Sequence, residues 1–180
     1  NREFSHLATL LRSEAIDYVV DVRSHPYSRF VPHFNRERLE SSLRDEGIGY
    51  LFLGDELGGR PSREDHYDEA GHALYGPMSE LPQFREALDR VKHGASDHRL
   101  ALLCSEADPT ECHRRLLVGR VLASENVKLR HLLPNGAILE ETEVRMGESR
   151  DQPTMFDGDL PWRSTQSVSR RQRLSASSGD

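Results

Sequence analysis

Apolar residues recur between residues 3 and 133 in two alternating patterns, one typical of helices and the other of buried strands. Helical spacing occupies residues 3–15, 36–46, 82–93 and 108–124. Short runs rich in aliphatic and β-branched side chains, which favour strands, occupy residues 18–23, 48–53, 100–104 and 127–133. This alternation predicts an α/β fold, a three-layer sandwich with a mostly parallel sheet of about four or five strands and helices on both faces.

Residues that begin or end helices stand where this pattern needs them. Gly47 follows the second helical segment, in the position where glycine commonly ends a helix. Asp108 and Pro109, with Glu111 three residues after Asp108, are typical of a helix start. The triplet Pro-Asn-Gly at 134–136 predicts a turn. The stretch 54–76 has no sustained period, which is typical of a site loop or a flexible insertion.

The composition changes after residue 146 to serine, arginine, glutamine, glycine and aspartate, with few apolar side chains to stabilise a fold. We therefore expect a single α/β domain over residues 1–146 and a disordered, flexible C-terminal tail over residues 147–180. Because the chain begins with Asn1 and not with methionine, we expect a fragment or a processed form whose domain is truncated at the N-terminus.

Charge and cysteine content narrow the classes of function. The 180 residues carry 24 lysines and arginines against 30 aspartates and glutamates, a net charge of −6. That balance argues against a protein held to bulk nucleic acid by a broad basic surface, although it allows a local basic patch. No apolar run approaches the roughly 20 residues of a membrane-spanning helix. Two cysteines are too few for a disulfide framework, so we expect a cytoplasmic protein.

Parallel α/β sheets bind ligands beyond the carboxyl ends of their strands, and one segment with reactive side chains there follows the run 100–104. Cys104 ends that run, and Cys112 and His113 lie in the predicted first turn of the next helix, where the helix dipole favours anions and reactive thiols. Glu106 and Arg114 are candidate ligand-binding residues beside them. A strand-end cysteine is, however, often only a small buried apolar residue.

Other chemistries of the two cysteines are weighed against this interpretation. A cysteine phosphatase needs an arginine six residues after its cysteine, where this chain has Thr110, and a sulfurtransferase loop needs backbone amides, one of which Pro109 removes. Zinc has three candidate ligands, but there is no Cys-x-x-Cys pair, and adjacent Cys112 and His113 are expected to point in different directions. We therefore predict neither a metal nor another cofactor. A Cys104–Cys112 redox pair stays open if the Cα atoms come within roughly 7 Å.

The second candidate segment follows the run 18–23. Asp21 and Arg23 lie two residues apart on one face of the predicted strand, where charges need either each other or a ligand. Further polar side chains suited to phosphate or carboxylate follow at Ser24, Ser28 and Arg29. His25 and His33 can also transfer protons, although the chain has 9 histidines and no single one stands out.

An ordered set of motifs resembles the domain-of-unknown-function 488 family. The set consists of Asp21-Val22-Arg23-Ser24 with Pro26, Ser28 and Arg29, then Phe34-Asn35, Gly47-Ile48, Leu57-Gly58-Gly59, Leu103-Cys104-Ser105-Glu106 and Cys112-His113-Arg114. The resemblance runs from Asn1 to about Gly136 and implies a bacterial α/β domain. Family members usually open with a strand that ends in a Gly-His-Ser-like motif, just before an Asn-Arg or similar pair. Asn1-Arg2 resembles that pair, so the resemblance implies that the opening strand is absent.

The tail contains a short motif, Gln152-Pro153-Thr154-Met155-Phe156, that is similar to the peptides by which bacterial repair and replication proteins bind the sliding clamp. Gln152 would be the polar anchor, and Met155 and Phe156 the apolar anchors, of such a peptide. Met155 and Phe156 can equally pack on the domain. If Trp162 folds back on the domain, as a lone tryptophan often does, the interpretation as a clamp-binding tail becomes weaker.

We expect an enzyme that acts on a small anionic or nucleotide-like ligand at a site shared by the two segments. Arg23, Arg29 and Arg114 would bind the anion. Cys104 or Cys112 would be the nucleophile, and Asp21 or His113 would transfer protons. The alternative is a non-catalytic module of DNA repair that binds a nucleotide or nucleic-acid end in the same pocket and is recruited through its tail.

Overall fold

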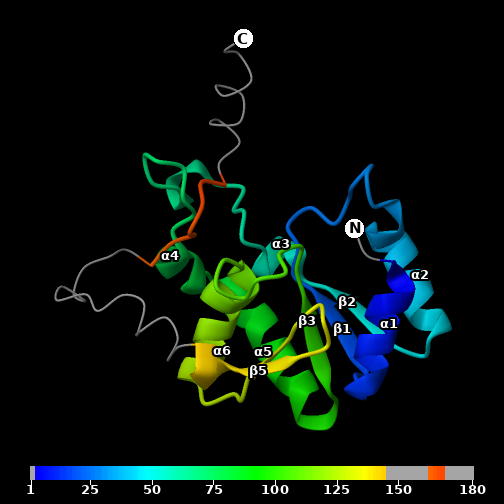
Figure 1. The fold of residues 1–180 in the computed structure, drawn as a ribbon. Helices are drawn as coiled ribbons and strands as arrows, with labels where there is room; N and C mark the ends of the chain where they lie inside the picture. The colour runs from blue at the N-terminus through cyan, green and yellow to red at the C-terminus, as the bar shows by residue number, and fades with distance from the viewer. Residues whose placement is uncertain (1–2, 145–161, 169–180) are drawn as a thin grey trace. The chain divides into compact units, whose positions relative to one another are not determined.

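The structure of this chain, a computed structural model, describes residues 3–144 and 162–168 (Figure 1). It divides into two compact units. Unit 1 comprises Asn1–Gly58 and Arg85–Ser105, and unit 2 comprises Gly59–Phe84 and Glu106–Asp180. Within the described ranges, no helix combines the length and apolar character needed to cross a membrane.

Unit 1 is built on a parallel sheet of three strands, which confirms the predicted α/β class. The strands are β1 (Tyr18–Asp21), β2 (Gly49–Phe52) and β3 (Leu100–Leu103), in the order β2-β1-β3. Val20 of the central strand pairs with Leu51 of β2 and Leu102 of β3. The apolar side chains Val19 and Val20 of this central strand point to opposite faces of the sheet, and both are almost completely buried.

Helices cover both faces of this sheet, as the sequence predicts. On one face, α1 (Phe4–Ser13) and α2 (Arg36–Asp45) form a core with β1. Its buried residues are Leu11, Val19, Leu39, Leu43 and Ile48, and Ala101 and Leu103 pack against them. Strand residues alternate between faces, so Leu100 points to the opposite face. Gly94 of α5 (Pro82–Asp97) lies against Leu100, which places α5 on that face.

Gly47 ends α2 as predicted, because it adopts a left-handed conformation with φ of +74° that glycine enters without a steric penalty. Two short helical segments complete the unit, η1 (Pro32–Phe34) and α3 (Gly54–Leu57). Both follow carboxyl ends of strands, η1 after the loop from β1 and α3 directly after β2. The loops beyond these strand ends are therefore short or locally ordered.

Unit 2 contains short helical segments and a β-hairpin. Its elements are η2 (Glu64–His66), α4 (Tyr75–Ser79), the π-helical segment η3 (Arg114–Gly119), α6 (Arg120–Ser124), β4 (Arg130–Leu132) and β5 (Ile138–Glu140). The run 127–133, predicted as a fourth strand of the parallel sheet, instead forms β4 and pairs antiparallel with β5. The physical reason is the turn at 134–136, which returns the chain at once and so favours a hairpin.

The stretch 54–76, without periodicity in the sequence, is ordered by short-range contacts. Tyr67 and Ala73 form an antiparallel bridge, and Asp68 accepts a hydrogen bond from the backbone N–H of His72 at 2.8 Å. Asp68 also forms an ion pair with Arg163. These contacts favour an ordered loop over a flexible insertion for this stretch.

Residues 162–168, orange in Figure 1, pack on other parts of unit 2. The indole N–H of Trp162 donates to the carbonyl of Leu116 at 2.6 Å, and the Arg120 guanidinium lies 4.6 Å from the indole ring. The Ser164 N–H donates to the carbonyl of Ala73 at 2.9 Å. Trp162 thus folds back on the domain, and this part of the expected tail is packed. The motif of Gln152, Met155 and Phe156 lies outside the described residues, as does the boundary at residue 146, and both stay predictions.

Candidate active site

The first candidate segment begins with a buried ion pair at the end of β1. Asp21 is fully buried, and Arg23 binds it with two side-chain hydrogen bonds, Nε to Oδ1 at 2.8 Å and Nη2 to Oδ2 at 2.6 Å. The Tyr50 hydroxyl donates to Oδ2 at 2.7 Å. Burial, together with the hydrogen bond to the carboxylate, raises the pKa of Tyr50. The third guanidinium nitrogen, Nη1, donates to the carbonyl of Phe34 at 3.0 Å.

These contacts favour a structural role for the pair. The Asp21 oxygens are occupied by Arg23 and Tyr50, and these donors compensate the burial of the charge. The sequence did not single out Tyr50, although its place on β2 directly beside β1 could have suggested it. Proton transfer by Asp21 and anion binding by Arg23 stay predictions.

The polar residues that follow have different surroundings. A Cβ on Gly58 would lie 2.3 Å from Ser24 Oγ, so Ser24 packs directly against the backbone of Gly58. The Ser28 N–H donates to Oδ1 of buried Asn35 at 2.6 Å. Arg29 is exposed, and its guanidinium carbon lies 4.9 Å from the centre of the Phe30 ring. Of the predicted anion-binding residues in this segment, Arg29 is the one presented to solvent.

The end of β1 adjoins the end of β3, where the second candidate segment starts. Asp21 pairs in register with Leu103, and the Val22 N–H donates to the Leu103 carbonyl at 3.1 Å. Cys104 is the next residue of the chain. Asp21 and Cys104 thus stand at the same carboxyl edge of the sheet in unit 1, as the sequence predicts, and on neighbouring strands.

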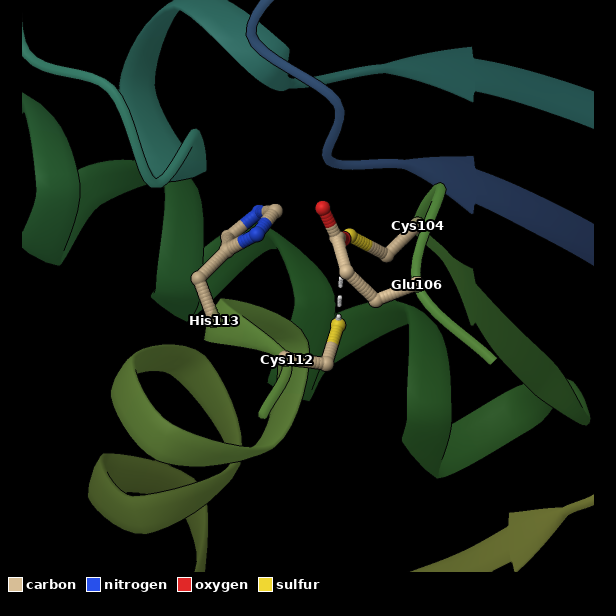
Figure 2. A group of neighbouring side chains, drawn as sticks. All are labelled: Cys104, Glu106, Cys112 and His113. Atoms are coloured by element: carbon tan, nitrogen blue, oxygen red, sulfur yellow. Dashed lines mark hydrogen bonds between the residues drawn. The ribbon is translucent and has the colours of Figure 1, made fainter. Parts of the chain in front are cut away.

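Residues 104–113 bring together two thiols, a carboxylate and an imidazole (Figure 2). Donor atoms of Cys104, Glu106, Cys112 and His113, which we call the donor cluster, lie within 4.8 Å of one another. Cys112 is fully buried, Glu106 is exposed, and the other two are half-buried. The Cys112 thiol donates a hydrogen bond to Glu106 Oε2 at 3.7 Å. The second candidate segment therefore forms a compact group of reactive side chains.

A tight turn at Asp108 returns the chain and so closes this group. The carboxylate of Asp108 accepts hydrogen bonds from the N–H and the hydroxyl of Thr110, at 2.8 and 2.7 Å. These bonds lower the pKa of Asp108. The Cys112 N–H then donates to the Pro109 carbonyl at 3.4 Å. The predicted cap at Asp108 thus stabilises a turn, and continuous helix begins only at His113.

Gly59 provides the space for His113. A Cβ on Gly59 would lie 2.5 Å from Cγ and 2.6 Å from Cβ of His113, distances that real Cβ contacts do not reach. The imidazole therefore lies directly against the Gly59 backbone. The motif Leu57-Gly58-Gly59 carried part of the resemblance, and the position of Gly59 explains why a larger residue does not fit there.

A buried charge network holds the helix that carries His113. Arg115 Nε lies 3.0 Å from Glu141 Oε2, and His131 Nε2 lies 2.7 Å from the same oxygen. Arg115 and His131 are both nearly inaccessible to solvent. The sequence reasoning missed these three residues, because residues 115 and 141 are far apart along the chain and no local pattern joins them. Arg114, a predicted anion-binding residue, begins η3 and is half-buried.

The donor cluster has the composition and size of a metal site. Tetrahedral zinc holds its ligand atoms about 3.3–3.8 Å apart, so a contraction of at most roughly 1.5 Å would bring the present atoms into place. Cysteine, histidine and glutamate are all zinc ligands. The sequence argument that adjacent Cys112 and His113 diverge is wrong, because their donor atoms both lie in the cluster. The helix begins between these two residues, so ideal helical directions do not apply there.

Comparisons with known proteins place the chain in a family. No curated protein and no solved structure matched it. The family model described as "Domain of unknown function DUF488" matches residues 4–121. That match includes all four residues of the donor cluster, the Asp21–Arg23 pair and Gly59. The chain therefore belongs to the DUF488 family, as its motifs indicated.

Proposed function

We propose that the chain is an enzyme that acts on a small anionic or nucleotide-like ligand at the donor cluster, and that the cluster works by holding a divalent metal ion. The observation that carries this proposal is the convergence of the donor atoms of Cys104, Glu106, Cys112 and His113 within 4.8 Å. A cysteine nucleophile needs one thiol and one base. The donor cluster has more reactive groups than such a nucleophile requires. Its thiols, imidazole and carboxylate are, however, the types of group that bind a metal ion.

The types of donor favour zinc over other divalent ions. Soft thiolates select zinc over magnesium and calcium, which prefer oxygen, and imidazole is also a good zinc ligand. Catalytic zinc sites commonly have three protein ligands and one open position. Cys104, Cys112 and His113 would supply such a set. Glu106, the exposed member of the cluster, would then face the substrate.

The surroundings of Cys112 support a bound cation over a thiolate nucleophile. Its fully buried thiol donates to the Glu106 carboxylate. Loss of that proton without a cation nearby would leave a buried thiolate facing a carboxylate, which costs desolvation and repulsion. A divalent ion bound to the Cys112 thiolate would offset both costs, since a coordinating thiol is deprotonated by the metal.

The chemistry that follows is hydrolysis. When bound, zinc supplies a water activated at neutral pH. Glu106 would accept a proton from the attacking water and deliver it to the leaving group. One bond forms from the water oxygen to the substrate, and one bond to the leaving group breaks. Arg114, which directly follows His113, would bind the anionic group of the substrate.

The experiment combines metal binding with thiol reactivity on the reduced full chain. Cobalt(II) is titrated as a spectroscopic substitute for zinc, and alkylation of the thiols by iodoacetamide is followed against pH with and without zinc. We expect equimolar binding, with thiolate-to-cobalt charge-transfer bands and the visible bands of tetrahedral cobalt. Zinc should protect both thiols from alkylation. Binding should weaken below neutral pH, because protons compete for the ligands.

Variants assign the ligands. Cys112→Ser and His113→Gln should each lower zinc affinity strongly, whereas His93→Gln, at an exposed histidine of α5, should leave it unchanged. If no metal binds and one thiol is alkylated at unusually low pH, a cysteine nucleophile replaces the metal in the proposal. If no metal binds and both thiols react slowly, the catalytic proposal is wrong and a non-catalytic binding module remains.

A further inference from the structure

The loop between β1 and η1, part of the blue segment that leads from β1 to α2 in Figure 1, presents two aromatic rings to solvent. Tyr27 is 76% exposed and Phe30 is 75% exposed. Among the described residues, the other large hydrophobic side chain with substantial exposure is Tyr18, at 39%. The two most exposed rings therefore lie three residues apart on one loop of unit 1.

Hydrogen bonds hold this loop in a defined conformation, so the rings are not exposed by local unfolding. Buried Asn35 accepts from the Ser28 N–H at 2.6 Å, and the Ser28 hydroxyl accepts from the Phe30 N–H at 3.2 Å. The Arg36 N–H donates to the Pro26 carbonyl at 3.0 Å. Exposed apolar side chains that are grouped on an ordered loop, in contrast to scattered single ones, can mark a binding surface.

The loop is also a basic segment of an acidic chain. Residues 22–36 include Arg23, Arg29 and Arg36, together with two histidines, and they contain no aspartate or glutamate, although the whole chain has a net charge of −6. Arg23 is paired with Asp21, and the Arg36 guanidinium lies over the Phe52 ring at 4.1 Å. The exposed Arg29 lies over Phe30, so it presents a positive charge beside that ring, two residues after Tyr27 in the sequence.

The loop has two exposed rings, with an arginine between them in the sequence. These groups are suited to bind a flexible polymer in which flat apolar groups are joined by anions. Unpaired bases stack on aromatic side chains, and phosphates bind arginine. A base pair inside a duplex does not offer its face in this way. The two rings are also far too small for a stable protein interface, which needs about 800 Å² from each partner. We propose that the loop binds single-stranded nucleic acid, through stacking on Tyr27 and Phe30 and a phosphate contact to Arg29.

This inference does not depend on the metal proposal, because no residue of the donor cluster takes part in it. It is also compatible with the net negative charge. Stacking contributes most of the affinity, and a single arginine adds only a shallow dependence on salt. The protein would therefore bind short unpaired stretches and would not coat DNA.

The test measures fluorescence anisotropy of a labelled oligothymidylate of roughly 12 nucleotides, with the full chain as titrant. The same strand annealed to its complement is the duplex probe, and oligoglutamate of equal length is the competitor. We expect saturable binding of the single strand, much weaker binding of the duplex and little competition by oligoglutamate. Equal binding of the duplex, effective competition by oligoglutamate or absence of saturable binding would overturn the proposal.

Variants locate the surface. Tyr27→Ala and Phe30→Ala should each weaken binding of the single strand roughly 5- to 150-fold, whereas Tyr27→Phe should retain it, because the ring remains. Arg29→Ala should reduce the dependence on salt by about one phosphate contact. Arg90→Ala, at an exposed arginine of α5, is the charge-matched control and should bind like the wild type. Because all these side chains are exposed, the variants should fold, which circular dichroism and urea denaturation verify. Wild-type affinity in both alanine variants of the rings would contradict the inference.

Discussion

Replacement of Gly59 by alanine should displace His113 and thereby lower both stability and metal affinity. The added Cβ would lie 2.5 Å from Cγ, 2.6 Å from Cβ and 3.0 Å from Nδ1 of His113. Ordinary carbon contacts are about 3.5–4.0 Å, so the two groups must separate by roughly 1 Å. Rotation of the imidazole cannot achieve this alone, because the His113 Cβ is itself too close. The backbone must therefore move.

The magnitude follows from that displacement. Overpacking of this kind costs about 1–3 kcal/mol of unfolding free energy. Metal–ligand distances tolerate only about 0.2 Å, so a shift of roughly 1 Å should weaken zinc binding about 10- to 100-fold, as loss of a supporting contact commonly does. Urea denaturation of the apoprotein measures the first effect, and competition with a chromophoric chelator measures the second.

Gly76→Ala is the matched control for this prediction. Gly76 also lies in unit 2, and a Cβ there would meet nothing within 4 Å. It should change stability by less than about 0.5 kcal/mol and leave zinc affinity unaltered. In a His113→Gly background, the cost of Gly59→Ala should largely disappear, because the two substitutions share one contact. Undiminished zinc affinity of Gly59→Ala, or an unchanged cost in that background, would refute the reasoning.

Three further predictions concern stability and titration. Tyr50→Phe removes the hydrogen bond to buried Asp21 and should cost about 1.5–3 kcal/mol in urea denaturation; a cost near zero would contradict the buried charge network. Thr110→Val removes the side-chain hydrogen bond that lowers the pKa of Asp108, so carboxyl NMR titration should show that pKa rising toward its ordinary value. Because the folded pKa is depressed, the contribution of Asp108 to stability is present above the unfolded pKa and is lost as pH falls through the folded value. Trp162→Phe loses an indole hydrogen bond to a backbone carbonyl and should cost about 0.5–1.5 kcal/mol, whereas an unchanged unfolding midpoint would show that residues 162–168 do not stabilise unit 2.

The helices and the parallel strands could be predicted from the sequence because the residues that they bury are apolar and recur at the spacing typical of each element. Leu39 and Leu43 recur at helical spacing on α2, and Val19 and Val20 belong to a short apolar run that only a central strand buries on both faces. Gly47 likewise predicts the end of its helix, because it adopts a left-handed conformation that few other residues adopt. In each case the information lies within a few neighbouring residues.

The partners within the candidate site were decided by the tertiary structure. Asp21 and Arg23 were recognised as charges that need a partner, but only the pairing of β1 with β2 brought Tyr50 to them. On a regular helix, the side chains of adjacent Cys112 and His113 would point in different directions, and this was the prediction from the sequence. The turn at Asp108 and the late helix start bring both into the donor cluster instead. Spacing along a chain determines the direction of a side chain only inside a regular element, so convergence at an irregular junction cannot be derived from it.

The sequence by itself thus determined the α/β class, the parallel strands and the two segments at their carboxyl ends, because hydrophobic periodicity and turn residues act locally. Only the tertiary structure decided that the run 127–133 leaves the parallel sheet for a hairpin, that Gly59 lies against His113, and that Trp162 packs on Leu116 and Arg120. These outcomes depend on contacts between residues far apart along the chain. The free energy of such a contact is gained only when the loop between its two residues closes. A pattern of neighbouring residues therefore does not predict it.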